Sequence, residues 1–192
     1  MHRFDLLGEI YALMAGPPVP EPGPRTLLQF LLEAVYFPLS RVMHELEDAE
    51  LDWAPVPDAK PIGWIPSGHD PSTDPFTTIG WRWEHFCQEL HDIAGSDICL
   101  GREAEPAPEI VDAASAVASL TAGIRRAARA IASTTDERLD EEVENEFGRH
   151  SRRHWVTLFL VEAVHHAAEI GVLRDLYRLR HHLGRDNGSP TI

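Results

Sequence analysis

The stretch VEAVHHAAEI, residues 161–170, places four titratable side chains inside an apolar segment. On an α-helix, Glu162, His165, His166 and Glu169 fall within an arc of roughly 100°. Glu162 with His166, and His165 with Glu169, are both four residues apart, a spacing that lets two side chains converge on one metal ion. On a solvated helix the same pairs would be ion pairs worth only about 0.3 kcal/mol. The apolar surroundings favour a metal, because a buried unpaired carboxylate is costly.

A third ligand would have to come from another helix, and the segment TIGWRWEHFCQEL offers His85. His85 lies where two tryptophans give way to a polar face made by Gln88, Glu89 and Asp92. Cys87 lies about 200° round the helix from His85, which favours a buried thiol rather than a fourth ligand.

The elements that must position these residues are helical. Apolar residues recur at spacings of three and four along four segments, which predict long helices over 26–51, 76–100, 110–133 and 152–183. Residues 52–75 are rich in proline and glycine and predict a long irregular loop between the first two long helices. This order predicts an all-α, antiparallel four-helix bundle with its chemistry between facing helices.

The length favours a single domain over residues 1–192. The proline-rich segment 17–25 separates a short N-terminal helix from a core of about residues 26–183, and residues 184–192 should form a mobile tail.

Composition and charge exclude several kinds of partner. The chain is 43% hydrophobic and 25% charged, as in globular proteins, and its net charge of −14 would repel nucleic acid and anionic membrane surfaces. No run approaches the roughly 20 apolar residues of a membrane span. The two cysteines form no disulfide framework or metal motif, which fits a reducing cytoplasm.

Three stretches together resemble the DinB-like four-helix bundle superfamily, in the branch common in actinobacteria. They are LDWAPVP at 51–57, DPFTTIGWRWEHF at 74–86 and HWVTLFLVEAVHHAAEIGVLRDLYR at 154–178. The resemblance runs from about Thr26 to about Leu183. In the related mycothiol-dependent maleylpyruvate isomerases and S-transferases, a histidine of the second helix and a glutamate–histidine pair of the last helix hold a divalent metal. The resemblance therefore implies His85, Glu162 and His166 as ligands.

The chain departs from these relatives in three places. Many of them have a further histidine or a glycine–histidine segment where this chain has Ala167, Ala168 and Glu169. The loop segment AKPIGWIPSG also differs, and the isomerases carry an additional C-terminal domain. These departures put the substrate contacts in question.

Two nitrogen ligands and one carboxylate leave an open coordination position, which is typical of a catalytic zinc site, although nickel or iron would accept the same ligands. An open metal lowers the pKa of a bound thiol or water. The resemblance implies a low-molecular-weight thiol such as mycothiol, transferred to a small electrophile by an S-transferase or a similar isomerase. The alternatives are a non-catalytic bundle that binds a metal or ligand, and a metal-free structural bundle.

Three further residues and the assembly stay open. Glu169 could support a metal ligand or be a surface carboxylate, and Arg82 and Arg174 could bind a carboxylate of a cofactor or substrate or form salt bridges. Bundles with an exposed apolar face often associate, so we expect a homodimer.

Overall fold

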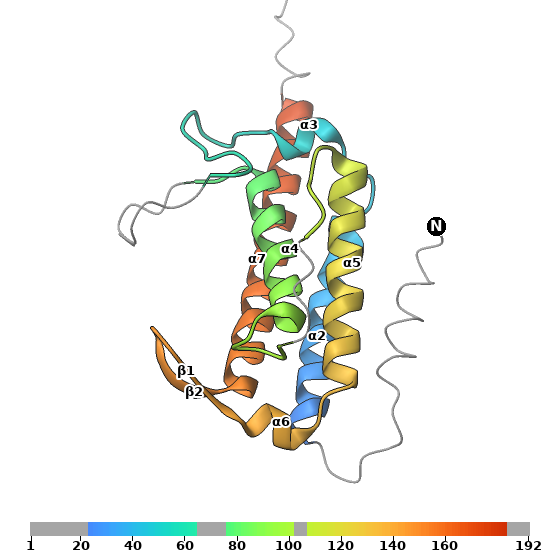
Figure 1. The fold of residues 1–192 in the computed structure, drawn as a ribbon. Helices are drawn as coiled ribbons and strands as arrows, with labels where there is room; N and C mark the ends of the chain where they lie inside the picture. Colours follow the sequence, from blue (N-terminus) through green and yellow to red (C-terminus); the bar gives the residue numbers. More distant parts are fainter. Residues whose placement is uncertain (1–22, 65–75, 102–106, 184–192) are drawn as a thin grey trace, which may run out of the picture.

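The computed structural model describes residues 23–64, 76–101 and 107–183, and this part of the chain is mostly helical (Figure 1). The predicted N-terminal helix, the tail and the second half of the predicted loop lie outside these residues. The elements in chain order are α2 Pro24–Val42, α3 Asp48–Leu51, α4 Ile79–Gly95, α5 Ala113–Ala132, α6 Asp136–Asp140, β1 Glu142–Asn145, β2 Gly148–Ser151 and α7 Arg152–Leu183.

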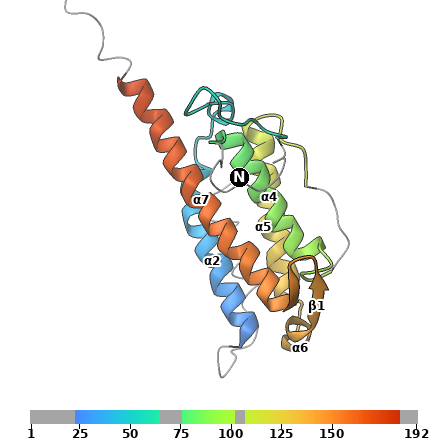
Figure 2. The same cartoon turned by 90° about the vertical axis from the view of Figure 1, so that its left-hand side faces the viewer.

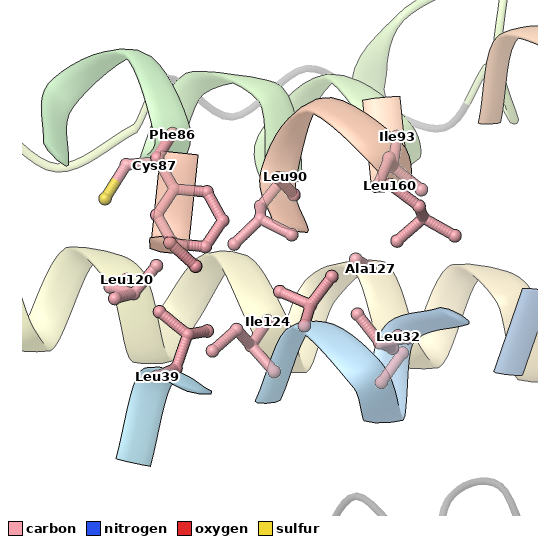
Figure 3. Packing of buried hydrophobic residues seen from close by; sticks show 14 of the residues in the cluster. Leu32, Leu39, Phe86, Cys87, Leu90, Ile93, Leu120, Ile124, Ala127 and Leu160 are labelled. Atoms are coloured by element: carbon pink, nitrogen blue, oxygen red, sulfur yellow. The ribbon is translucent and has the colours of Figure 1, made fainter. Parts of the chain in front are cut away.

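The four long helices α2, α4, α5 and α7 pack around one apolar core (Figure 3). Each contributes residues spaced by three and four, so that one stripe of every helix faces inward. Buried members of this core are Leu32, Leu39, Phe86, Leu90, Leu120, Ile124 and Leu160. Trp83 is also fully buried, and its indole Nε1 donates a hydrogen bond to the carbonyl of Ala116 at 2.8 Å.

The helices do not all run antiparallel, which corrects one part of the predicted architecture. In Figure 1, α2 and α7 run in one direction and α4 and α5 in the other. Contacts agree, since Val42 near the end of α2 accepts a hydrogen bond from Arg174 near the end of α7. The difference arises because α5 starts at the same end of the bundle as α4. The α4 and α7 pair remains antiparallel.

Helix ends follow local capping chemistry where the sequence supplies it. Thr78 begins α4 by accepting a hydrogen bond from the Trp81 backbone N–H, and Asp112 with Ser115 forms a capping box at the start of α5. Helix α4, Ile79–Gly95, lies within the predicted range of 76–100 and is shorter at both ends. The predicted last helix over 152–183 matches α7.

The first predicted helix, 26–51, is wrong at its C-terminal end. The chain leaves the helix after Val42, Glu45 has a positive φ of 54°, and a separate short helix α3 follows. The backbone carbonyls of Val42, His44 and Glu45 are turned toward the guanidinium of Arg174 and accept its hydrogen bonds. A buried cation from α7 therefore stabilises the break, which no local pattern could reveal.

The link between α5 and α7 contains structure that the sequence did not predict. Helix α6 is followed by a hairpin in which β1 pairs with β2, with Glu142 opposite Ser151 and Asn145 opposite Gly148. Gly148 has a φ of 112°, a conformation that favours glycine at this turn. The hairpin leads directly into α7 (Figure 2).

Within the described residues, one helix has the length and composition needed to cross a membrane, over Arg152–Arg180 in α7. The sequence had predicted no such run. Core helices of globular proteins pass the same test, and α7 packs its inner face against α2 and α4. The length and composition of α7 therefore carry no membrane assignment by themselves.

Candidate metal centre

Helices α4 and α7 bring three ligand-type side chains together midway along their contact. His85 and Glu89 stand one turn apart on α4, and His166 faces them from α7. The Glu89 Oε1 atom lies 3.6 Å from His85 Nε2 and 3.8 Å from His166 Nε2. One ligand atom from each residue lies within 4.8 Å of the other two. The structure therefore joins His85 and His166, as predicted, and adds Glu89.

The carboxylate of Glu89 is buried without full hydrogen bonding. Glu89 is 5% exposed, and its Oε2 atom has no hydrogen-bond partner. Burial, followed by the negative charges of Glu162 and Asp92, raises the pKa of Glu89 to about 8. A buried carboxylate in this condition is costly unless a cation or donor joins it.

His85 presents a neutral imidazole nitrogen to this carboxylate. Partial burial, with the nearby His166 and Arg82, lowers the pKa of His85 to about 4. The His85 and His166 rings meet edge to face with centroids 4.9 Å apart. A neutral imidazole keeps a lone pair available, which is the form that binds metals.

A second carboxylate orients His166 from behind. The Glu169 Oε2 atom lies 2.9 Å from His166 Nδ1 and 2.7 Å from the Arg82 guanidinium. Burial would raise the pKa of Glu169, but the hydrogen bond from His166 and the charge of Arg82 outweigh it, so that the pKa is lowered. In the tautomer with Nδ1 protonated, His166 donates a hydrogen bond to the ionised Glu169, and its Nε2 lone pair is left on the side of Glu89. This arrangement is common behind histidine metal ligands.

The centre opens on the His85 side. The His85 side chain is 46% exposed, whereas those of Glu89 and His166 are below 10%. Trp81 stacks on His85 with ring centroids 5.1 Å apart, and its indole N–H donates to the Trp64 carbonyl at 2.7 Å. The Arg82 guanidinium lies over the Trp81 ring, 5.5 Å from its centroid.

Glu162 lies beside the centre but outside the group of three. Its side chain is 41% exposed, and its Oε2 atom lies 3.8 Å from His165 Nδ1. His165 is also exposed and contacts Glu169 at 3.1 Å. The charge of Glu162 acts on Glu89, so the two carboxylates are neighbours. The role of Glu162 as a ligand stays a prediction, and Glu89 is the carboxylate that lies within 3.8 Å of both histidine Nε2 atoms.

The donor set fits a divalent metal ion. Two imidazole nitrogens and one carboxylate oxygen around a tetrahedral zinc ion at 2.0–2.2 Å would lie roughly 3.5 Å from one another. The observed separations of 3.6 Å and 3.8 Å from Glu89 Oε1 are close to that spacing. Such an ion would also satisfy the orphaned carboxylate. With three protein ligands, a position would remain for an exogenous molecule on the exposed side.

The sequence contains a spacing signal for Glu89. His85 and Glu89 are four residues apart on α4, the same spacing as Glu162 and His166 on α7. Glu89 also belongs to the polar face of α4 that includes Gln88 and Asp92. Whether that face looks outward or toward α7 depends on the packing of the two helices.

The two arginines considered for ligand binding are engaged within the protein. Arg82 pairs with Glu169. Arg174 is 2% exposed and forms a buried ion pair with Glu50 of α3, with the guanidinium NH2 group 2.9 Å from Glu50 Oε1. Arg174 therefore stabilises the fold at the end of α7. Cys87, as predicted, is a buried free thiol, and burial raises its pKa to about 12.

Comparison with known proteins adds one result to this geometry. The model of the DinB superfamily matches residues 31–170, which include all of α4 and the metal-centre part of α7. The chain belongs to the DinB superfamily. Comparisons with curated proteins and with solved structures gave no match. The superfamily includes metal-binding members, and the matched region contains His85, Glu89 and His166.

Proposed function

We propose that this DinB-superfamily protein holds a divalent metal ion between α4 and α7 through His85, His166 and a carboxylate. The observation that carries this proposal is the buried Glu89 carboxylate, which has one oxygen without a hydrogen-bond partner and two histidine nitrogens within 3.8 Å of the other. Glu162 is the competing carboxylate, supported by the resemblance to mycothiol-dependent relatives. Zinc is the expected metal, and nickel would accept the same donors.

The favoured reaction is transfer of a low-molecular-weight thiol, such as mycothiol, to a small electrophile, or an isomerisation of similar mechanism. A metal bound here would lower the pKa of a coordinated thiol and stabilise its thiolate. Support from the chain's own residues is the half-exposed His85 beside Trp81, which leaves one side of the centre accessible. Glu169 and Arg82 would hold His166 in the ligating tautomer. The actinobacterial affiliation and a cytoplasmic location belong to the same proposal.

A non-catalytic metal-binding protein is the second candidate. The observation that favours it is the engagement of Arg82 with Glu169 and of Arg174 with Glu50, since neither guanidinium is then available to a substrate carboxylate. Metal binding without turnover of any thiol and electrophile pair would support this candidate.

The deciding measurement is the metal content of untagged protein after incubation with zinc or nickel and removal of loose ions. We expect roughly one ion per chain in the wild type and loss of that ion in His166→Ala. His154→Ala, an exposed histidine of α7 outside the group, is the matched control and should retain the ion. Comparing Glu89→Ala with Glu162→Ala identifies the carboxylate ligand.

The results separate the candidates. A wild type without metal would overturn the proposal. Metal bound with His166→Ala as firmly as in the wild type would place the ion elsewhere. If the centre is established, thiol consumption with mycothiol and small electrophiles distinguishes the transferase from the binding protein.

A further inference from the structure

The two histidines of the metal centre are held unequally by their polar neighbours. Glu169 Oε2 lies 2.9 Å from His166 Nδ1, and the His166 side chain is 6% exposed. The His85 side chain is 46% exposed, and its Nε2 atom lies 3.6 Å from Glu89 Oε1, which is longer than a hydrogen bond. A half-exposed side chain that is free to change rotamer loses that freedom when it binds an ion. A ligand role for His85 therefore requires another contact that holds its ring.

Trp81 supplies such a contact from the preceding turn of α4. The Trp81 and His85 rings stack with centroids 5.1 Å apart and planes inclined by 21°. Residues four apart on a helix are neighbours on its surface, so the stacking follows from their spacing. The edge-to-face contact of His85 with His166, at 4.9 Å between centroids, adds to it. The stacked tryptophan thus fixes the plane of the exposed imidazole.

Trp81 is itself held by the end of the described loop before α4. Its indole Nε1 donates a hydrogen bond to the Trp64 carbonyl at 2.7 Å. The preceding residue, Gly63, has a φ of 77°, which favours glycine, and its backbone N–H donates to the Glu84 carboxylate at 2.8 Å. The loop therefore contacts α4 on either side of Trp81 in the sequence of hydrogen bonds that leads to His85.

Two further contacts attach the same stretch of loop to the start of α4. The Lys60 backbone N–H donates to the Phe76 carbonyl at 2.8 Å, and the Thr78 N–H donates to the Lys60 carbonyl at 2.9 Å. Ile62 packs so closely on Gly80 that a Cβ atom at this glycine would lie 2.6 Å from Ile62 Cδ1. Backbone hydrogen bonds and packing together therefore fix the acceptor of the indole N–H.

We propose that Trp81 is a positioning residue for the metal ligand His85, and that residues 60–64 hold Trp81 in place. This inference rests on the proposed metal centre. The face of Trp81 keeps the imidazole oriented with Nε2 on the side of Glu89, which reduces the entropy lost when an ion binds. Residues 60–64 contain no histidine, cysteine or carboxylate, so their part in the centre is indirect.

The test is the zinc affinity of the full, untagged chain, measured by competition with a chromophoric chelator. Trp81→Leu should lower the affinity about 10-fold, and Trp81→Phe, which keeps an aromatic face, should lower it less than about 3-fold. Trp53→Leu is the matched control, because it removes a partly buried tryptophan that packs on Tyr177, and it should bind zinc as the wild type does. Helical circular dichroism should be the same for all four proteins.

A double-mutant cycle separates positioning from a general effect on the fold. Because Trp81 acts through His85 in this proposal, adding Trp81→Leu to His85→Ala should cause no further loss of affinity. An equal loss in both backgrounds would give Trp81 a structural role and overturn the proposal, as would wild-type affinity in Trp81→Leu. A wild type that binds no zinc would instead overturn the proposed metal centre itself.

The part played by the loop has its own measurement. The indole N–H signal of Trp81 is identified by its absence from the NMR spectrum of Trp81→Phe. Its exchange with solvent should slow when zinc binds, because a contact that favours ion binding is in turn favoured by the bound ion. Equal exchange rates with and without zinc would overturn the role of residues 60–64.

Discussion

Helix α7 carries two buried polar residues two turns apart, His166 and Arg174, and their surroundings differ. The guanidinium of Arg174 is surrounded by acceptors, both carboxylate oxygens of Glu50 and three backbone carbonyls from the end of α2. Around His166 the acceptor Glu89 has one oxygen with no hydrogen-bond partner, and its nearest nitrogens are beyond 3.5 Å.

The difference separates a structural site from a site prepared for a ligand. A buried charge with complete hydrogen bonding needs nothing further and holds the surrounding chain in one arrangement. An incompletely hydrogen-bonded buried carboxylate beside two histidines is unfavourable by itself and is stabilised by a cation. The following predictions, from the largest effect to the smallest, test this contrast.

Removing Arg174, the cation of the fully hydrogen-bonded site, should have the largest effect on stability. Arg174→Met leaves Glu50 buried without its partner and should lower the free energy of unfolding by about 3–5 kcal/mol, measured by urea denaturation. The double variant Glu50→Met with Arg174→Met should recover most of this loss, because no uncompensated charge remains. A single-variant loss below about 1 kcal/mol would show that the pair is not a buried structural site.

At the incompletely hydrogen-bonded site around Glu89, removing the charged group should instead increase stability. In metal-free protein, held with a chelator, Glu89→Gln should raise the free energy of unfolding by roughly 1–3 kcal/mol, because an incompletely bonded buried carboxylate is removed. The folded-state pKa of Glu89 is raised to about 8 from 4.5, so wild-type stability falls as the pH rises between these values. The advantage of the variant should grow over that range and level off above it.

Added zinc should make the wild type more stable than Glu89→Gln, since only the wild type would be stabilised by binding the ion. A Glu89→Gln variant that is less stable than the wild type without metal would mean that the carboxylate is already satisfied in the folded protein.

Glu169, which lies 2.9 Å from His166 Nδ1, should affect metal affinity more than folding stability. Glu169→Gln weakens the acceptor for the His166 Nδ1 proton and frees Arg82, and we expect zinc affinity to fall about 10–100-fold. The measurement is competition with a chromophoric chelator. Glu144→Gln, an exposed acid of the hairpin, is the control for lost negative charge and should bind as the wild type does. Equal affinities for both variants would restrict Glu169 to a surface role.

The smallest effect is expected at Asp112, a half-buried side chain whose hydrogen-bond partner is in its own helix. Asp112 caps α5 through Ser115, and the backbone hydrogen bond from Ser115 lowers the pKa of the carboxyl. Its contribution is present above the unfolded pKa and is lost as the pH falls through the lower folded pKa. Asp112→Ala should therefore reduce Tm slightly at pH 7, and the difference from wild type should disappear in acid. A difference that persists at low pH would point to a role beyond the ionised cap.

Much of the helical organisation could be predicted because its causes are local. Thr78 with the apolar repeat after it predicts α4, and the uninterrupted repeat of residues 152–183 predicts α7. The end of α2 could not be predicted, since it depends on Arg174, more than 120 residues away in the chain. The hairpin of β1 and β2 was missed because its strands are four residues each and mostly charged or polar.

The sequence by itself determined the four long helices, apart from the end of α2, and which of their faces are apolar, because periodicity and capping act within a few turns. Spacing on α7 left two glutamate–histidine pairs open, and the resemblance pointed to His166 together with His85. Only the tertiary structure decided that Glu89 lies next to the two histidines while Glu162 lies at their edge. It also decided that Arg174 forms a buried ion pair with Glu50 instead of binding a ligand. These outcomes depend on the direction and rotation of each helix against its neighbours, which is set by packing across the whole core.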